Sequence, residues 1–442
     1  MLLQVLLLLA LLGLATVGGS PMTASLPAHA PTQKRVLVLL DDPELKTQAS
    51  NYFEQLGQLG FQLKFRKVSD ASTLVFKTNG EFDFDSVILW FSKATNCHER
   101  SVHNVLEFID NGGNLLLASN GKSNFASEVA FECGVQLGSL PVRDRFTEQG
   151  ETGQVITVPW KENVIVGRGE GEVKYIGTWS EPSKEASALG AIQALVGAMT
   201  TYSKEQKYGS HVSLISSVQM KNNARVSIAG SVEMFTNALG NLEYAKRLSL
   251  WTFGESGVLR VDSWRHGKQN GDSFVLQKSH KSEMAHKNLP RSHFPDPEWG
   301  PNSKIYRIRD EVRYELELSV LGMDGRWTPY LANDLQVEFA MLDAYQRINF
   351  KSLGSGKYVA EFMLPDQYGT FAFRVVYNRP GLSSIRLLDS VNVRPFSHNE
   401  YERFIPNAFP YYTAVFVVMI GFLLFSCAFA HAPKPSHHAK SE

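Results

Sequence analysis

Residues 35–60 read RVLVLLDDPELKTQASNYFEQLGQLG and join an apolar run to a periodic segment. After Arg35, RVLVLL (35–40) is a continuous run of Val and Leu, typical of a strand that is covered on both faces of a parallel sheet. Asp42 as N-cap and Pro43 as first helical residue predict that a helix begins here. Apolar residues then recur on one helical face, at Leu45, Ala49, Phe53, Leu56 and Leu59. The stretch therefore predicts the first strand and helix of an α/β sheet.

The same alternation continues to about residue 135. Three further buried strands are predicted in FQLKF, in DSVILWF (85–91) and in NLLLAS (114–119). Helical segments are expected around residues 102–109 and 125–131. Repeated β-α-β units of this kind predict a doubly wound α/β region with right-handed crossovers over residues 34–150.

Residues 151–269 are less regular and are either a continuation of the α/β region or a second lumenal subdomain. QVITVPW, EVKYIG and VSLISSVQM predict strands, and LEYAKRLSLWTF predicts an amphipathic helix. NNARVSIAGSVEMF predicts a strand at 225–229, a Gly-Ser turn, and a helix capped by Ser231. Residues 270–303 are polar, contain His and Pro and show no period, so we expect an irregular linker or insertion.

Residues 304–398 change to alternating apolar and polar positions separated by turns, which predicts antiparallel strands. Within them, DQYGTFAF (366–373) resembles the strand-entry corner of an immunoglobulin-like sandwich, with Phe where Tyr is usual. The fold class is therefore α/β followed by a β-sandwich.

Two long apolar runs flank these regions. The run at 2–17, followed by small residues, predicts a signal peptide over residues 1–20 with cleavage between about 19 and 30. An uncleaved signal anchor is the alternative. The run at 411–430 is long enough for a transmembrane helix, preceded by a juxtamembrane joint at 399–410 and followed by a cytosolic tail at 431–442. This arrangement predicts a single-pass type I protein with its bulk in the lumen.

Composition limits the function classes. The 44 basic and 44 acidic residues give a formal net charge of zero, which argues against a nucleic-acid partner. Of the three cysteines, Cys97 and Cys133 either form a disulfide or remain as buried or free thiols, and Cys427 lies in the membrane run. HExxH and CxxC motifs are absent, so we expect neither a metal site nor a cofactor.

Residues with possible chemistry each have a structural alternative. Asp41 and Asp42 follow a buried strand, where they could bind a sugar or a metal, or act as an N-cap and a solvated neighbour. Residues 229–231 (Ala-Gly-Ser) could bind an anion or form an ordinary N-cap. GRGEGE (167–172) has no helix after it and is interpreted as a turn.

Cys97-His98 is similar to the Cys-His pair of glutamine-amidotransferase-like folds. A nucleophile elbow places its residue on a sharp turn directly after the strand, usually beside Gly. Here SKATN separates Cys97 from the strand and no Gly is near. We therefore predict no catalytic residue.

Several segments resemble one known family. They are VLVLLDDPELKTQASNYFEQL, FIDNGGNLLLAS, ECGV, NNARVSIAGSVEMF, GVLRVDSWRH, LQVEFAMLDAYQR, LPDQYGTFAFRVVYNRPG and VNVRPFSHNEYERFIPNAFPYY. On these residues the chain resembles the 48 kDa non-catalytic subunits of the dolichyl-diphosphooligosaccharide–protein glycosyltransferase complex, the oligosaccharyltransferase. This complex transfers a preassembled oligosaccharide from dolichyl diphosphate to Asn of N-x-Ser/Thr sites in nascent proteins.

The resemblance implies an amidotransferase-like α/β domain without a nucleophile, β-rich lumenal domains and one C-terminal membrane helix. It implies a location in the endoplasmic reticulum membrane and a role in assembly, stability and substrate positioning. The implied partners are the other subunits, including the multi-spanning catalytic one, the bilayer and the glycan of the lipid-linked donor. The competing hypotheses are a lumenal amidotransferase-like hydrolase and a single-span surface receptor or adhesion protein.

The segment before the membrane run contains more than an anchor needs. Its two prolines each fix their own φ and restrict the preceding residue, so they predict a rigid entry to the membrane. We predict an assembly surface made of Tyr401, Glu402, Arg403, Phe404, Pro406 and Pro410.

Overall fold

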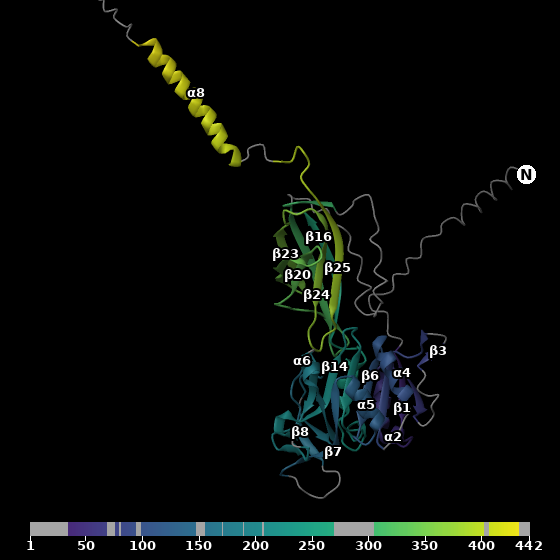
Figure 1. Ribbon diagram of the computed structural model, residues 1–442. Helices are drawn as coiled ribbons and strands as arrows, with labels where there is room; N and C mark the ends of the chain where they lie inside the picture. Colours follow the sequence, from purple (N-terminus) through teal and green to yellow (C-terminus); the bar gives the residue numbers. More distant parts are fainter. Residues whose placement is uncertain are drawn as a thin grey trace, which may run out of the picture.

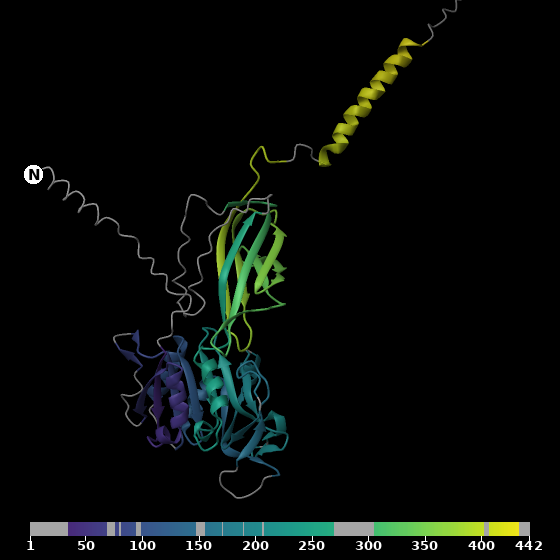
Figure 2. The same cartoon turned by 180° about the vertical axis from the view of Figure 1, so that it is seen from behind.

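The computed structural model places three parts of the chain in a row (Figures 1 and 2). An α/β region lies at one end, a β-sandwich lies in the middle, and an isolated helix extends beyond the sandwich. The residues that the structure describes are 34–68, 76–78, 81–93, 99–146, 155–169, 171–188, 190–205, 207–268, 305–401 and 406–432. The predicted signal peptide, the segment 270–303, Cys97 and most of the tail lie outside these residues.

A seven-stranded sheet forms the centre of the α/β region, in the order β11-β14-β15-β6-β5-β1-β2. Its members are β1 (Arg35–Leu40), β2 (Gln62–Lys67), β5 (Ser86–Phe91), β6 (Asn114–Ser119), β11 (Ile192–Val196), β14 (Ser213–Gln219) and β15 (Arg225–Ala229). The five strands from β15 to β2 are parallel, and β14 and β11 continue the sheet in antiparallel fashion. The strands predicted at 114–119 and 225–229 have these bounds in the structure.

Helices cover both faces of this sheet. On one face lie α2 (Leu45–Gln48), α3 (Ser50–Gln58) and α7 (Leu242–Thr252), and on the other lie α4 (Glu99–Asp110) and α5 (Asn124–Glu132). Alternate residues of β1 belong to two different buried clusters: Val36 and Val38 pack toward α3 and α7, whereas Leu37 and Leu39 pack toward α4 and α5. This burial on both faces is why residues 36–40 (VLVLL) contain no polar residue, whereas Arg35 at the start of the strand is only partly buried.

The helix predicted from Pro43 begins later and is broken. α2 starts at Leu45, and Ala49, with φ −110° and ψ 28°, separates it from α3. Asp42 does not cap the helix, because its Oδ1 instead accepts a hydrogen bond from the Glu44 amide at 3.1 Å. That contact spans two residues and closes a turn before the helix.

Smaller sheets and short elements complete the α/β region, most of them within residues 135–208. A four-stranded sheet contains β7 (Val135–Asp144), β10 (Thr178–Pro182), β12 (Thr201–Ser203) and β13 (Lys207–Tyr208). β8 (Ile156–Pro159) and β9 (Glu172–Tyr175) form a hairpin, as do the short strands β3 (Lys77–Thr78) and β4 (Glu81–Phe82). The remaining short elements are α6 (Lys184–Ala188) and η2 (Gly209–His211).

The helix predicted after Ser231 is only the 3₁₀ turn η3 (Glu233–Phe235). Ser231 does bond to the turn, because its Oγ accepts from the Met234 amide at 3.2 Å. The same hydroxyl donates to the carbonyl of Ile176, and the residue is fully buried. This engagement contradicts the anion-binding alternative for residues 229–231.

The β-sandwich consists of two sheets packed around one buried cluster. One sheet contains β16 (Val258–Lys268), β18 (Glu311–Leu321), β23 (Lys357–Met363), β22 (Lys351–Gly354) and β19 (Trp327–Pro329). The other contains β17 (Ile305–Arg307), β25 (Ile385–Arg394), β24 (Gly369–Tyr377), β20 (Gln336–Ala340) and β21 (Ala344–Asn349). The sandwich therefore begins at Val258, before the segment 270–303, and not at residue 304 as the sequence pattern suggested. The pairing of β16 with β18 joins positions about fifty residues apart, which local periodicity does not reveal.

The loop between β24 and β25 fastens the sandwich to the α/β region. Trp251 Nε1 of α7 donates to the carbonyl of Gly381 at 2.8 Å. Asn223 Oδ1 accepts from both the amide and the hydroxyl of Ser384 at 2.8 Å. The two regions thus share specific hydrogen bonds and do not merely touch.

The C-terminal helix α8 (Phe409–Ala430) contains 22 residues and its side chains are exposed. It is the only helix among the described residues that is long and apolar enough to cross a bilayer. It starts two residues earlier than the predicted run, after the 3₁₀ turn η5 (Pro406–Ala408). Pro410 lies in its first turn, where the missing amide hydrogen costs no helical bond.

Candidate functional site

The carboxyl ends of β1 and β5 mark the point where the strand order reverses. β2 lies on one side of β1 and β5 on the other, so the two connections leave in opposite directions. Open α/β sheets bind their ligands outside the carboxyl ends of the strands at such a point. Asp41 directly follows β1 and Ser92 directly follows β5, which makes this edge the candidate site.

Asp41 ties the two strand ends together. Its Oδ2 accepts from the backbone amides of Ser92 at 2.8 Å and Lys93 at 2.7 Å, and the Ser92 hydroxyl lies 3.2 Å from both carboxylate oxygens. A carboxylate that accepts several amide hydrogens fixes the backbone that donates them. Asp41 therefore shapes the turn after β5 and does not cap a helix.

Asp42 and Lys93 form an ion pair at the same edge. Lys93 Nζ lies 2.5 Å from Asp42 Oδ2. The hydrogen bond from Lys93 lowers the pKa of the Asp42 carboxyl, and the same bond raises the pKa of Lys93. Asp42 is thus partnered by a cation, and neither aspartate presents an unpaired carboxylate to a sugar or a metal.

Asn120 and Glu233 extend the edge to β6 and β15. Asn120 Nδ2 donates to Glu233 Oε1 at 2.9 Å, while its Oδ1 accepts from the Val232 amide at 3.0 Å. Glu233 Oε2 is buried and has no hydrogen-bond partner among the described residues. Burial, followed by the charge of Glu233, raises the pKa of Tyr175, whose hydroxyl donates to the carbonyl of Thr178 at 2.6 Å.

Sequence reasoning identified Asp41 and Asp42 but missed the residues that surround them. Ser92, Lys93 and Asn120 each follow a predicted strand within two residues. The carboxyl ends of the strands predicted in DSVILWF and NLLLAS could therefore have pointed to them. Glu233 could not be found this way, because its contact with Asn120 spans more than a hundred residues.

The side chains with possible chemistry at this edge are engaged within the fold. Ser92 Oγ contacts only a carboxylate in the contacts above, and no group of three or more His, Cys, Asp or Glu side chains among the described residues could hold a metal. Cys97 and His98 lie outside the described residues. Cys133 is a buried free thiol in the structure, as in the unpaired alternative. Burial raises its pKa to about 12, which makes it a poor nucleophile.

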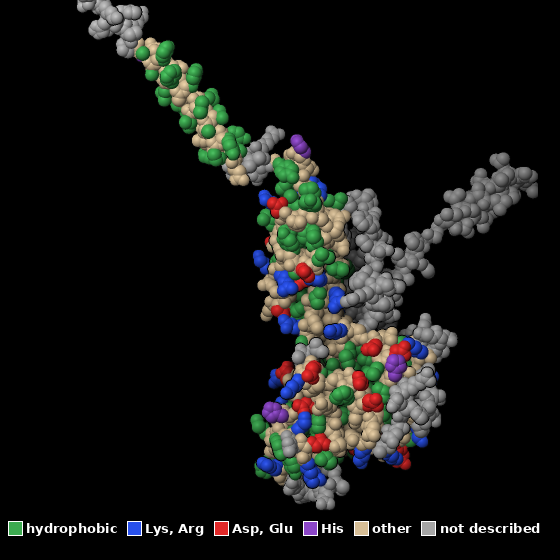
Figure 3. All heavy atoms as spheres, viewed as in Figure 1, with side chains coloured by type: hydrophobic (Ala, Val, Ile, Leu, Met, Phe, Trp, Pro, Cys, Tyr) green, Lys and Arg blue, Asp and Glu red, His purple; other side chains and the backbone are tan. Residues whose placement is uncertain are grey.

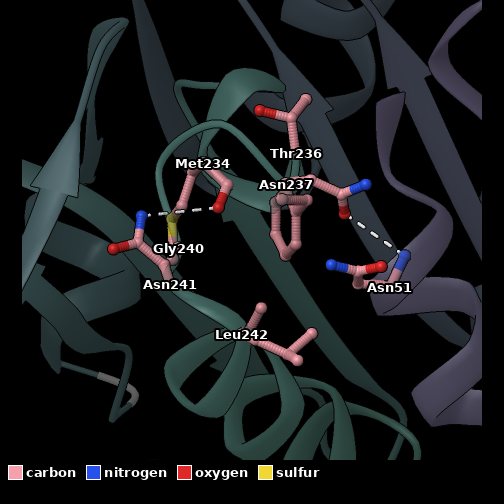
Figure 4. A pocket seen from close by; sticks show the side chains of 9 residues that line it. Asn51, Met234, Thr236, Asn237, Gly240, Asn241 and Leu242 are labelled. Carbon is pink, nitrogen blue, oxygen red and sulfur yellow. Dashed lines mark hydrogen bonds between the residues drawn. The ribbon is translucent and has the colours of Figure 1, made fainter. Parts of the chain in front are cut away.

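A small pocket lies next to Glu233, between α3 and α7 (Figure 4). The Asn237 side chain points toward Asn51 there, and the backbone N–H of Asn51 donates to Asn237 Oδ1 at 3.2 Å. Asn241 Nδ2 donates to the carbonyl of Met234 at 3.4 Å. The cavity volume is about 40 Å³, which is far below the several hundred Å³ of a typical ligand site.

A larger hollow of about 280 Å³ lies where α7 meets the β18–β19 turn of the sandwich. Its lining is formed by Arg168, Glu243, Lys246, Arg247, Leu250, Met323 and Asp324. Arg247 is already bonded to Glu243 at 2.9 Å and to the carbonyl of Arg168 at 2.7 Å. The hollow therefore belongs to the junction between the two regions.

The predicted assembly surface is only partly within the described residues. Tyr401 is exposed, and its ring centroid lies 5.5 Å from that of Phe396. Pro406 opens η5 and Pro410 lies in the first turn of α8. Glu402, Arg403 and Phe404 lie outside the described residues, so the surface stays a prediction.

Comparison with known proteins gives the family. The model of the OST48 N-terminal domain matches residues 27–255, and the model of the OST48 middle domain matches residues 287–433. The chain belongs to the OST48 family. The two matches together include the candidate edge, most of the sandwich and α8.

Full-length OST48 relatives agree with this assignment. Three proteins called dolichyl-diphosphooligosaccharide--protein glycosyltransferase 48 kDa subunit are similar to this chain. The Drosophila melanogaster protein is 32% identical, covering 90% of this chain and 92% of the relative. The Danio rerio protein is 31% identical over 90% and 91%, and the Arabidopsis thaliana protein is 30% identical over 93% and 95%.

Solved structures add less to the OST48 assignment. A ThuA-like protein from Parabacteroides merdae is 13% identical and covers 50% of this chain and 89% of that chain, with a TM-score of 0.32. A similar protein from Bacteroides uniformis is 12% identical with a TM-score of 0.33, over 50% of this chain and 93% of that chain. Scores of this size carry no argument about fold or function.

Proposed function

We propose that this chain is an accessory subunit of the oligosaccharyltransferase complex of the endoplasmic reticulum membrane. In this role it takes part in transferring a preassembled oligosaccharide from dolichyl diphosphate to Asn of N-x-Ser/Thr sites in nascent proteins. The observation that carries the proposal is similarity over nearly the whole chain to proteins that bear the 48 kDa subunit's name, at 30 to 32% identity.

We infer further that the chain is not itself catalytic and that a multi-spanning partner performs the transfer. The carboxylates at the reversal point support this division of labour, because Asp41 accepts from backbone amides and Asp42 is paired with Lys93. A general base must be able to reach a substrate proton, and these two groups are already engaged within the fold.

The finer fold names are part of the same proposal. Parallel strands with helices on both faces support an amidotransferase-like α/β region, and the burial of Phe371 and Phe373 at the start of β24 supports an immunoglobulin-like sandwich. In the division that we propose, a signal peptide at 1–20 precedes the α/β region at 34–150 and its continuation from 151 to the start of β16. The sandwich begins with β16 at Val258 and is interrupted by an insertion at 270–303. The joint at 399–410, the helix and a cytosolic tail then follow.

We propose a type I orientation, with the α/β region and the sandwich in the lumen and one membrane crossing by α8. The length of 22 residues supports a single crossing, because it spans about 33 Å at 1.5 Å per residue. The lumen is also where acceptor sites of nascent chains and the donor oligosaccharide meet.

The geometry favours a role in assembly over direct contact with the donor diphosphate. The amino ends of the parallel strands face the sandwich, since Arg225 at the start of β15 bonds to the carbonyls of Ser256 and Gly257, which lead into β16. The candidate edge therefore lies at the end of the α/β region away from α8. A group at that end is better placed to contact an acceptor chain or outer sugars than a lipid-borne diphosphate.

Co-purification from membranes tests the proposal. A tagged full-length chain solubilised in mild detergent should bring down the multi-spanning catalytic subunit, as measured by mass spectrometry. The double variant P406G/P410G loosens the entry to α8 and should lower this recovery, whereas P433G/P435G beyond the helix serves as the matched control. Recovery of the chain as a lone monomer would contradict membership. If P406G/P410G recovered as much catalytic subunit as the unsubstituted chain, the segment 399–410 would be a flexible connection and not a rigid joint.

Cell fractionation addresses the competing classes. An adhesion protein or receptor should reach the plasma membrane, and a hydrolase should lose an activity in C97A. Our proposal expects residence in the endoplasmic reticulum and unchanged glycosylation in C97A.

A further inference from the structure

The end of the sandwich from which the chain leaves toward α8 is formed by three groups of strand ends. β25 ends there at Arg394, and β24 begins there, because Gly369 pairs with Val393. The β20–β21 turn lies at the same end, since Ala340 pairs with Ala372 near the start of β24. The opposite end is the one fastened to the α/β region through Gly381 and Ser384.

Large apolar side chains are exposed at the α8-facing end. We call this set the apolar tip: Met341 (40% exposed), Leu342 (90%), Tyr345 (55%), Met363 (57%) and Tyr368 (64%). The β20–β21 turn packs against the start of β24. The Met341 methyl group lies so close to Gly369, the neighbour of Tyr368, that a Cβ added at Gly369 would be 2.7 Å from it. Figure 3 shows hydrophobic side chains gathered over this half of the sandwich. Other exposed apolar side chains lie elsewhere on the sandwich, among them Leu331, Leu353, Val376 and Leu388, but these five share one end. A group of this kind indicates a surface that meets something apolar.

The chain between the sandwich and α8 is short. Glu400 is held to the sandwich by Arg394, at 2.7 and 2.8 Å, and by the Ser397 amide at 2.7 Å. Only residues 401–408 separate this anchor from α8, which begins at Phe409. Fully extended, that segment spans at most ~30 Å. The apolar tip is therefore held within reach of the membrane surface that α8 enters.

The chemistry of the tip fits a bilayer interface. Tyr, Leu and Met combine apolar bodies with, in Tyr, a polar end, and Tyr is enriched where membranes meet water. The charged neighbours Arg309 and Asp366 neutralise one another in an ion pair at 2.6 Å. Asp343 follows Leu342 in the exposed turn, and a carboxylate stays at the level of the headgroups because it is costly in hydrocarbon.

We propose that the apolar tip rests in the lipid interface of the bilayer that α8 crosses, so that the sandwich stands on the membrane. The occupant of this surface is the bilayer itself, and attraction to anionic lipid is not required. The inference uses the membrane crossing by α8 but does not depend on the role in oligosaccharyltransferase. β18 has 11 residues and is about 36 Å long at ~3.3 Å per residue, so the α/β region is held about that far from the lipid.

Quenching by brominated lipid tests this contact on the full-length chain. The chain is reconstituted into phosphatidylcholine nanodiscs with bromine on the upper acyl chain, and the fluorescence added by L342W is compared with that of the unsubstituted protein. We expect the added emission to be quenched at least twofold relative to unbrominated discs. The matched control is L353W, because Leu353 is 63% exposed at the end of β22 away from the tip, and its added emission should not change.

Two further arms make the result decisive. F416W in the middle of α8 should be quenched in discs brominated at mid-chain, which verifies insertion, and a rise in salt should leave the L342W result unchanged. If L342W emitted equally in brominated and plain discs while F416W was quenched, the proposal would be wrong. The apolar tip would then be a contact surface for a protein partner. Equal quenching of L342W and L353W would overturn it too, because the sandwich would then lie on its side.

Discussion

At the scale of single residues, Arg225 connects β15 to the end of α7 and to the segment that leads into the sandwich. It lies at the start of β15 and is 2% exposed, and its guanidinium donates to the carbonyls of Trp251 at 2.8 Å, Ser256 at 2.6 Å and Gly257 at 2.7 Å. Trp251 is in the last turn of α7, where carbonyls lack helical partners and a cation is favoured. Burial lowers the pKa of Arg225 to about 9, so the group is still a cation at neutral pH.

Replacing Arg225 should therefore be costly. R225M leaves three buried carbonyls without their donor, and we expect the free energy of unfolding to fall by about 3 kcal/mol. R225K keeps the charge but not the planar fork and should recover only part of the loss. Chemical unfolding of the detergent-solubilised chain measures both. R326M, at an exposed position, is the control and should change the free energy by no more than about 0.5 kcal/mol. An equally small change in R225M would contradict this account of Arg225.

Glu400 gives a pH dependence at the same scale. Hydrogen bonds from Arg394, then from the Ser397 amide, lower the pKa of the Glu400 carboxyl to about 2 from its ordinary 4.5. Because the pKa is lower in the folded state, the bonded form is fully present above about pH 4.5 and is lost as the pH falls toward 2. The contact is thus intact at the near-neutral pH of the endoplasmic reticulum.

E400Q should imitate the acid form at neutral pH. The neutral amide weakens the bidentate pairing with Arg394, so we expect faster hydrogen exchange in a peptide covering residues 395–401. E361Q, on the opposite sheet, should leave this peptide unchanged. If E400Q and the unsubstituted chain exchanged at the same rate from pH 7 to pH 3, the carboxylate would not hold this segment.

At the scale of elements, the β24–β25 loop determines whether the sandwich and the α/β region behave as one body. Asn223 accepts from the amide and hydroxyl of Ser384, and its Nδ2 donates to the carbonyl of Ser384 at 3.4 Å. Within the sandwich, Ser383 holds the same loop to β16, because its Oγ donates to the carbonyl of Leu259 and accepts from the Leu259 amide at 2.8 Å. The contacts of Asn223 with Ser384 therefore connect the α/β region to a loop that is itself fixed on the sandwich.

N223A removes the three bonds to Ser384. We expect the free energy of unfolding to fall by about 1–3 kcal/mol and the amides of residues 379–384 to exchange faster. Differential scanning calorimetry and exchange mass spectrometry measure the two effects. N349A on the exposed side of β21 is the control, because Asn349 contacts Gln336 within the sandwich only. Unchanged exchange at 379–384 in N223A would mean that the junction does not depend on this side chain.

The elements also show what a sequence can and cannot reveal. Strands at 35–40, 114–119 and 225–229 were predictable because burial on both faces leaves continuous apolar runs. Residues 258–268, which form β16, were grouped with residues 151–269 and not with the sandwich, because the pairing of β16 with β18 crosses the segment 270–303. The helix at residue 43 was predicted too early because Asp42 serves a turn and an ion pair instead of a cap. Contacts between distant residues, such as Asn120 with Glu233, leave no local period.

At the scale of the whole molecule, the sandwich lies between the α/β region and α8 (Figures 1 and 2). In the orientation that we propose, α8 anchors the chain, and the edge with Asp41 and Lys93 faces away from the membrane. This arrangement would suit the accessory role that we propose, because it would hold the chain beside a membrane-embedded enzyme and present a surface to soluble chains. Family membership, and not a catalytic constellation, is what connects this shape to glycosylation.

The central claim is that the chain belongs to an oligosaccharyltransferase without performing the transfer itself. Its most direct test is the transfer of oligosaccharide from dolichyl diphosphate to an N-x-Thr peptide, measured on material purified through a tag on the full-length chain. We predict activity in the complex eluted in mild detergent, and loss of at least tenfold when a harsher detergent strips the chain of its partners. No activity in the intact eluate would contradict membership, and full activity of the isolated chain would contradict the accessory role.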